Sequence, residues 1–448
     1  MSEIPDAEAP EVGAPDVDAH EEAEDAGQVR HRTRAPQAAP PPPPPPEASP
    51  LAEADLVVVK VGSSLLVDPG KGDVRAEWLD ALADDLADLH RAGKRVLVVS
   101  SGAIGLGREA LGFRPGRLRL EESQAAASVG QIRLAHRWQS ALARHRINVA
   151  QILLTLGDTE DRRRFLNARA TIEMLWRLGA IPVVNENDTV ATSEIRFGDN
   201  DRLAARVAQM MMADCLVLLS DVDGLYDADP RRKKSAKLIP WVEEVTPEIE
   251  AMAGLKKTEY GSGGMRTKLL AARIAGHAGC AMAIARGIEP HPIRRLLEGA
   301  PCTWFAALDS AFNARKSWIA ASLQPLGALI VDKGAKRALD RGRSLLPAGV
   351  TAVTGTFDRG DPVIVADAEG WELGRGLCAY SSDDARTIAG HRSREITRLL
   401  GYRGRDEIIH RDDLVVHTTG PWLRLPPDLR TPDQAREIER DEAEAEAS

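Results

Sequence analysis

The sequence predicts a three-layer αβα sandwich with a mainly parallel sheet, followed by a small β-rich domain. Between residues 55 and 285, short runs rich in Val, Ile and Leu alternate with segments whose apolar residues recur at helical spacing. Nearly continuous apolar strands are typical of a parallel sheet that helices cover on both faces. Beyond about residue 324, short strands separated by Gly, Pro and Asp replace this alternation and indicate a separately packed β-rich domain.

The α/β part begins with an apolar, β-branched run at residues 55–61. Four leucines between residues 75 and 90 then lie at helical spacing, which predicts a helix there. The further elements expected in this part are the strand 95–100, the helix 121–145, the strand 149–154, the helix 162–178, the strand 181–184, the helix 200–212, the strand 215–219 and a last strand 281–285. In the small domain we expect strands at 327–331, 350–354, 362–366 and 376–380 and one helical stretch near 382–400.

Composition divides the chain into five expected regions. Twelve of the 28 prolines fall within the first 50 residues, amid Ala, Glu and Asp. Such a segment buries too little apolar surface to offset chain entropy, so we expect it to be disordered. The regions are a disordered extension 1–52, an α/β domain 53–310, a linker 311–324, a β-rich domain 325–416 and an acidic disordered tail 417–448.

The formal net charge of −9 comes from the two ends of the chain. Residues 1–50 carry 3 basic and 11 acidic side chains, and residues 417–448 carry 4 and 8. Residues 51–324, by contrast, carry 37 basic and 34 acidic side chains. The acidity is therefore a property of the expected tails rather than of a binding site.

Composition also excludes some classes of protein. No apolar run approaches the ~20 residues needed to cross a bilayer. The N-terminus lacks the basic start and apolar core of a signal peptide. The four cysteines form no C-x-x-C pair and suggest neither a disulfide framework nor a thiolate zinc site. We therefore expect a cytoplasmic protein that does not enter a membrane.

Small and polar residues follow the predicted strands at their carboxyl ends, where ligands bind in open parallel sheets. After the first strand, Lys60 with Gly62 and Ser63 can set an ammonium group beside loop amides that approach an anion; a solvated lysine and an ordinary turn are the alternative. After the second, Ser101 and Gly102 begin a helix and can hold a carboxylate; simple helix capping is the alternative. The glycine spacing that follows, G-x-x-G-x-G, differs from the dinucleotide fingerprint and does not favour a dehydrogenase.

Amides and carboxylates gather after the fourth predicted strand. Residues 185–189 follow a buried strand directly, and residues 197–201 begin the next helix. Asp188, Asn200 and Asp201 suit recognition of an ammonium or hydroxyl group, although a solvated loop and a helix cap would explain some of these residues. No His accompanies the acids, so we expect no protein-only metal site.

Two further strand exits can contact a nucleotide. Ser220 and Asp221 can approach an adenine or ribose, with a plain turn as the alternative. Residues 261–268 place successive amides, a hydroxyl and the Lys268 ammonium group at a helix start, which makes a phosphate cradle; a flexible Gly/Ser linker is the alternative. Two lysines, two Gly-rich cradles and an acid that can orient the lysines favour phosphoryl transfer, which needs positioning and charge neutralisation more than covalent catalysis.

These motifs together resemble those of the glutamate 5-kinases, enzymes of the amino-acid-kinase fold. The resemblance covers residues 53–416, and the stretch 325–416, which includes 342–350, looks like the PUA domain of the bacterial enzymes. The motifs that carry it occur in order at 58–64, 101–104, 165–169, 185–188, 198–201 and 263–268.

The resemblance implies transfer of the ATP γ-phosphoryl group to the γ-carboxylate of L-glutamate, which gives L-glutamyl 5-phosphate in the first step of proline biosynthesis. Mg²⁺ would be bound mainly through the nucleotide. Lys60, Lys268 and Asp201 would be catalytic, and Ser101, Asp188 and Asn200 would bind glutamate. The residues implied to bind ATP are Lys60, Gly62, Ser63, Ser220, Asp221, Ser262, Gly263, Gly264, Met265, Arg266, Thr267 and Lys268.

Two positions depart from the pattern that we associate with these enzymes. Ser262 stands where a threonine is usual and keeps the hydroxyl group. Arg266 replaces a small polar residue and adds a cation near the expected phosphates.

The resemblance also implies feedback inhibition by L-proline, a homo-oligomer, and a functional partnership with glutamyl-phosphate reductase. Two alternatives stay open at this point. The acceptor can be that of another kinase of the same fold, such as aspartate, N-acetylglutamate, carbamate or UMP. The small domain can instead bind RNA, although its 14 basic and 14 acidic residues give the phosphate-backbone attraction no overall support.

Overall fold

The computed structural model describes residues 49–68, 72–114, 116–190, 199–253, 264–308, 325–416 and 423–436. The expected N-terminal extension up to residue 48 and the expected linker 311–324 lie outside these residues. Among the residues that are described, no helix is both long enough and apolar enough to cross a membrane.

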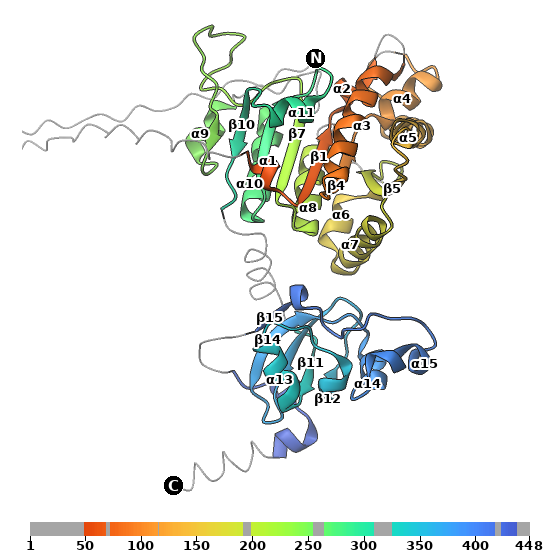
Figure 1. The fold of residues 1–448 in the computed structure, drawn as a ribbon, viewed down its shortest axis with the longest axis vertical. Helices are drawn as coiled ribbons and strands as arrows, with labels where there is room; N and C mark the ends of the chain where they lie inside the picture. Colours follow the sequence, from red (N-terminus) through yellow and green to blue (C-terminus); the bar gives the residue numbers. More distant parts are fainter. Residues whose placement is uncertain are drawn as a thin grey trace, which may run out of the picture. The chain divides into compact units, whose positions relative to one another are not determined.

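The larger sheet has eight strands among the described residues, in the order β5-β6-β4-β1-β7-β9-β10-β8 (Figure 1). β1 lies between β4 and β7 and runs parallel to both, and β10 runs antiparallel to β9. The strands are β1 (Leu56–Val61), β4 (Arg95–Ser100), β5 (Val149–Leu154), β6 (Ile181–Glu186), β7 (Cys215–Ser220), β8 (Trp241–Val242), β9 (Ala281–Arg286) and β10 (Cys302–Phe305). The predicted mainly parallel sheet is confirmed.

The prediction that residues 281–285 form the last strand is wrong. β10 and β8 extend the sheet beyond β9. These two strands have four and two residues, so neither is long enough to produce a periodic pattern in the sequence.

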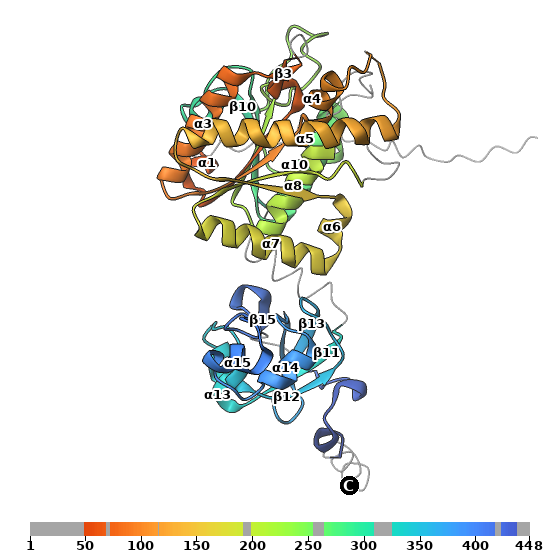
Figure 2. The same ribbon diagram turned by 90° about the vertical axis from the view of Figure 1, so that its right-hand side faces the viewer.

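Helices cover both faces of this sheet because side chains alternate along each strand. Val57, Val59 and Val61 of β1 belong to a core shared with the helices of one face, whereas Leu56 and Val58 belong to the core of the other. The first face carries α3 (Ala76–Arg91), α4 (Ala103–Ala110), α5 (Leu120–Ala143) and α11 (Pro292–Leu297). The second carries α7 (Arg162–Arg177), α8 (Asp199–Met211) and α10 (Met265–His277), and Figure 2 shows α5 and α7 on opposite sides of the strands.

Shorter elements connect these strands and helices. They are α1 (Pro50–Glu53), α2 (Ser63–Leu66), the paired strands β2 (Val67–Asp68) and β3 (Asp73–Val74), α6 (Leu156–Glu160) and α9 (Pro247–Met252).

The smaller sheet has five strands among the described residues, in the order β12-β11-β13-β14-β15. The strands are β11 (Gly327–Val331), β12 (Val350–Gly355), β13 (Pro362–Ala366), β14 (Glu372–Leu377) and β15 (Leu414–Val416), and the helices are α13 (Lys333–Leu339), α14 (Ser382–Ile388) and α15 (Ile396–Leu400). Short 3-10 turns lie at Pro347–Gly349, Ser393–Glu395, Arg411–Asp413 and Pro427–Leu429. The predicted β-rich domain is confirmed.

Two expected elements of this domain are shifted. The strand expected at 376–380 lies at Glu372–Leu377, and the helical stretch expected near 382–400 is two helices. Gly390, with φ of 77°, adopts the left-handed conformation between them, which an α-helix cannot continue through.

Residues 423–436 are the described part of the acidic tail expected at 417–448. Residues 423–436 are ordered against the smaller sheet, where Leu425 and Leu429 are buried. The Thr354 hydroxyl donates a hydrogen bond of 2.6 Å to the Leu429 carbonyl, and the Gln434 amide donates to the Asp367 and Ala368 carbonyls. Isolated leucines between prolines gave no helical or strand period, so the sequence did not reveal this packing.

Candidate active site

A fully buried carboxylate, Asp201, lies between two lysine ammonium groups. Its Oδ1 is 2.6 Å from Lys60 Nζ and its Oδ2 is 3.0 Å from Lys268 Nζ. The Thr267 hydroxyl also lies 3.0 Å from Oδ2. The three charged residues come from β1, α8 and α10, and the fold thus brings together all three residues that the sequence predicted to be catalytic.

Local structure explains how each lysine reaches Asp201. Lys60 is the fifth residue of the six-residue strand β1, and alternation points it to the same face as Val58, which is the face of α8 and α10. Lys268 lies one turn into α10, after Gly264 has adopted the extended backbone conformation of a helix N-cap. Both lysine side chains are buried.

The charges of this cluster are strongly coupled. Burial disfavours the ionised form of Asp201, but the two ammonium groups outweigh it and hold the pKa of this carboxyl well below its usual range. Burial lowers the pKa of Lys60, with Lys268 acting in the same direction and Asp201 opposing. An anion that approaches the lysines would stabilise their ammonium form, because it adds negative charge where burial and like charge disfavour that form.

A second group of polar side chains lies around Asn200, which precedes Asp201. The Asn200 amide donates a hydrogen bond of 2.6 Å to the Ser101 hydroxyl and one of 3.3 Å to Asn185 Oδ1. Its own amide oxygen is buried and, among the described residues, accepts no hydrogen bond. A buried acceptor without a donor carries a desolvation cost, and an ammonium group of a bound molecule would satisfy it.

The turn that holds Ser101 is fixed by close backbone packing. Gly102 begins α4 with a φ of 112°, in the region that favours glycine. α4 also touches α5 directly: a Cβ at Gly130 would come 1.7 Å from the Ala103 carbonyl oxygen. The N–H groups at the start of α4 therefore have a defined position, and such groups can receive a carboxylate.

Asp188 lies two residues beyond the end of β6, at the strand exit that also carries Asn185. Its side chain is buried, and burial raises the pKa of the Asp188 carboxyl to about 6. This group therefore changes charge close to neutral pH.

Ser220 and Asp221 lie at the end of β7, the strand beside β1. The Ser220 hydroxyl is 3.1 Å from Asp221 Oδ1, and the Ser220 carbonyl accepts a 2.8 Å hydrogen bond from Gly287 N–H. The Asp221 charge contributes to the pKa of Lys60, in the upward direction, so these two strand exits interact electrostatically.

The other predicted nucleotide residues border the lysines where they are described. Gly62 is the N-cap of α2, and a Cβ there would lie 3.7 Å from Lys60 Nζ; Ser63 is the first residue of that helix. Gly264, Met265, Arg266 and Thr267 form the start of α10, and Arg266 is exposed. Ser262 and Gly263 lie outside the described residues.

Two residues support the site although the sequence analysis assigned neither of them to a ligand. Asn185 receives the Asn200 amide, and the Gln131 amide on α5 donates a 3.2 Å hydrogen bond to the Glu186 carbonyl. Asn185 belongs to the polar run that marked this strand exit. Gln131 lies in the middle of a helix, where nothing in the sequence distinguishes it from a solvated residue.

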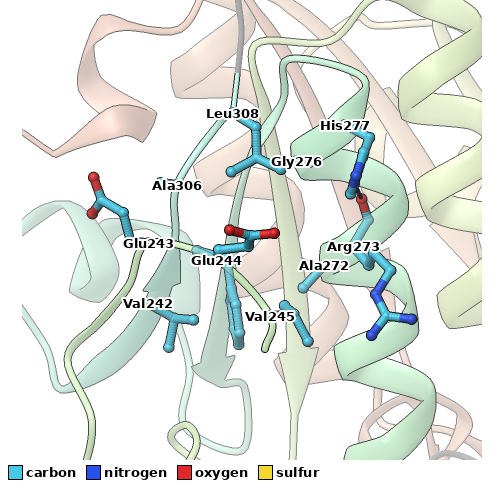
Figure 3. Close-up of a pocket in the computed structure, with 11 residues that line it drawn as sticks. Val242, Glu243, Glu244, Val245, Ala272, Arg273, Gly276, His277, Ala306 and Leu308 are labelled. Atoms are coloured by element: carbon cyan, nitrogen blue, oxygen red, sulfur yellow. Dashed lines mark hydrogen bonds between the residues drawn. The ribbon is translucent and has the colours of Figure 1, made fainter. Parts of the chain in front are cut away.

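The cleft drawn in Figure 3 lies at the opposite edge of the sheet. It is lined by residues at the C-terminal half of α10, including Arg273 and His277, and by residues that follow β8 and β10. Since β10 is antiparallel to β9 and parallel to β8, these strands end away from Asp201. We therefore place the candidate site at the cluster of charged residues rather than at this cleft.

Two models of known protein families match this chain. The model of the amino acid kinase family matches residues 55–286, and that of the PUA domain matches residues 327–400. The chain belongs to the amino acid kinase family and carries a PUA domain after its kinase part.

Curated relatives narrow this class. A glutamate 5-kinase of Paramagnetospirillum magneticum is 62% identical over 82% of this chain and 99% of its own length. Glutamate 5-kinases of Rhodospirillum rubrum and Gluconobacter oxydans are 60% and 59% identical, over 80% and 82% of this chain and 96% and 97% of their own lengths. Each of these matches covers at least 80% of this chain.

The buried position of Asp201 predicts a large effect of its charge on stability. Asp201→Asn leaves two buried ammonium groups without their counter-charge, so we expect the free energy of unfolding in urea to fall by about 3–5 kcal/mol. The matched control is Asp88→Asn, which breaks two exposed ion pairs, with Arg91 and Arg294, and should cost less than about 1 kcal/mol. Equal losses in the two variants would contradict the account of the buried cluster.

Proposed function

We propose that this protein transfers the γ-phosphoryl group of ATP to the γ-carboxylate of L-glutamate and forms L-glutamyl 5-phosphate, the first step of proline biosynthesis. The observation that carries the proposal is Asp201 between Lys60 and Lys268, in a chain 62% identical to a curated glutamate 5-kinase. Two ammonium groups held side by side suit a reaction whose transition state spreads negative charge over phosphoryl oxygens.

Strand order supports a division of the site into two halves. In the sequence of strands β6-β4-β1-β7-β9, the residues assigned to glutamate follow β4 and β6, whereas Ser220 and Asp221 follow β7. Lys60 belongs to β1, which lies between the two groups. A phosphoryl group that passes from nucleotide to glutamate would therefore cross the sheet edge at Lys60.

Each half has groups that match its ligand. We assign the start of α4, with Ser101, to the α-carboxylate of glutamate, and Asp188 with the Asn200 amide oxygen to its ammonium group. The γ-carboxylate is ionised at neutral pH and can attack without a general base. Lys60 and Lys268 would then neutralise the charge of the transferring group, with Asp201 holding both in place.

We assign the nucleotide to residues at and just after the ends of β1 and β7 and around the start of α10. They are Lys60, Gly62, Ser63, Ser220, Asp221 and the stretch from Ser262 to Lys268. Mg²⁺ would enter with ATP, bound mainly through the phosphate oxygens, and would neutralise part of their charge.

We also propose a domain organisation, a location, an oligomeric state and partners for the enzyme. We place the kinase domain at 53–310 and the PUA domain at 325–416, with an N-terminal extension before them. We further propose a cytoplasmic homo-oligomer, inhibited by L-proline. Because an acyl phosphate is labile, glutamyl-phosphate reductase is the proposed partner that consumes the product.

The direct test is to incubate the purified chain with Mg²⁺, ATP and a panel of acceptors and to trap acyl phosphate with hydroxylamine. We expect hydroxamate with L-glutamate and none with aspartate or N-acetylglutamate. Turnover of another acceptor without turnover of glutamate would overturn the proposed function.

The role proposed for Lys268 predicts that its removal lowers kcat rather than the affinity for glutamate. Lys268→Ala removes a charge that acts on the transferring phosphoryl group, so kcat should fall by about 10²–10³ while the KM for glutamate changes little. Arg273→Ala, at the other end of α10, is the matched control and should keep kcat. An increase in glutamate KM with unchanged kcat would refute the role given to Lys268.

The raised pKa of Asp188 predicts a pH dependence of glutamate use. Below a pH of about 6 the carboxyl is protonated and cannot pair with the substrate ammonium group, so kcat/KM for glutamate should fall about tenfold per pH unit there. Asp188→Asn should have a low kcat/KM above that pH and lack this step, which separates it from titration of ATP. A wild-type profile that stays flat down to pH 5 would refute the assignment.

A further inference from the structure

Thr303 is a fully buried residue of β10 whose hydroxyl group holds the loop that leaves β7. Its Oγ1 accepts a 2.7 Å hydrogen bond from Leu225 N–H and donates one of 2.7 Å to the Ile239 carbonyl. Ile239 N–H in turn donates 2.8 Å to the Leu225 carbonyl. Through this one side chain, β10 therefore holds two segments of backbone, at Leu225 and at Ile239.

Gly224 shows independently that the loop lies tightly against this residue. A Cβ at Gly224 would come 2.3 Å from Thr303 Oγ1 and 2.7 Å from Leu238 Cδ1. The backbone of Gly224 is outside the left-handed region, so the glycine is needed for its close approach rather than for its conformation.

The course of the loop links Thr303 to the proposed nucleotide site. β9 lies between β7 and β10, so residues 221–224 cross its carboxyl end. One end of the crossing is fixed where Gly287 N–H binds the Ser220 carbonyl, and the other where Thr303 binds Leu225. Two strand spacings amount to roughly 10 Å, whereas five residue steps can reach roughly 17 Å. The loop thus has slack, and its course depends on the two anchors.

We propose that Thr303 is a positioning residue for nucleotide binding. By fixing Leu225, it sets the course of the loop that begins at Asp221, directly after Ser220. The inference rests on the proposed assignment of these two residues to ATP. The residues assigned to glutamate follow β4 and β6, on the other side of β1, so release of the loop should weaken ATP binding selectively.

The test first compares two variants of the full chain with wild type. Thr303→Val keeps the shape of the side chain and removes both hydrogen bonds, whereas Thr303→Ser keeps the hydroxyl group. ATP affinity is measured by isothermal titration without an acceptor. We expect about tenfold weaker ATP binding for Thr303→Val, and binding within about threefold of wild type for Thr303→Ser. The KM for glutamate at saturating ATP should change less than about twofold in both.

Two further variants keep the result interpretable. Gly224→Ala pushes the loop away from Thr303 by a different route and should give the same selective loss of ATP affinity. Thr354→Val removes a side-chain hydrogen bond of the same kind in the small domain and should leave ATP affinity unchanged.

The proposal is overturned if Thr303→Val binds ATP as wild type does, if Thr303→Ser loses as much affinity as Thr303→Val, or if glutamate KM rises by the same factor. Titration with ATP needs no acceptor, so a chain that binds ATP but forms no glutamyl hydroxamate would refute the proposed acceptor and leave this test valid. A wild-type chain that binds no ATP would refute both.

Discussion

The contact of one buried carboxylate with two ammonium groups is the interaction on which the site depends. Asp201 can stay ionised in a buried position only because Lys60 and Lys268 lie beside it. Asp201 in turn opposes the lowering of the Lys60 pKa that burial causes. A buried cluster of two basic side chains and one carboxylate can attract an anion, and it is suited to bind a phosphoryl group without a large reorganisation.

The parallel sheet brings the residues of this contact together. Neighbouring parallel strands end at one edge, so polar residues more than 200 positions apart meet there, as Lys60 and Lys268 do. The helices add their own constraints: α4 and α5 touch through glycines, which fixes the turn of Ser101 and Gly102, and β10 holds the loop after β7 through Thr303. The reactive centre is thus built on β1, and its flanks are held by elements packed around it.

The sequence predicted those features of the fold and site that a pattern among neighbouring residues can indicate. Long strands and helices have a period, and Lys60, Lys268 and Asp201 stood at recognisable strand exits and helix starts. It did not predict β8 and β10, which are too short to show a period, or the packing of Leu425 and Leu429. Gln131 and Thr303 were missed because their roles arise from hydrogen bonds to distant backbone groups, which leave no trace in neighbouring residues.

A crystal structure of the chain with Mg²⁺, a non-hydrolysable ATP analogue and L-glutamate would show whether both buried lysines contact the transferring phosphoryl group. We expect Lys60 Nζ and Lys268 Nζ both to keep their contact with Asp201 and both to lie within about 3 Å of γ-phosphoryl oxygens. We also expect the γ-carboxylate of glutamate on the far side of that phosphorus atom, in line with the bond to be broken. A nucleotide bound with its γ-phosphoryl group away from either lysine would contradict the role proposed for the two lysines.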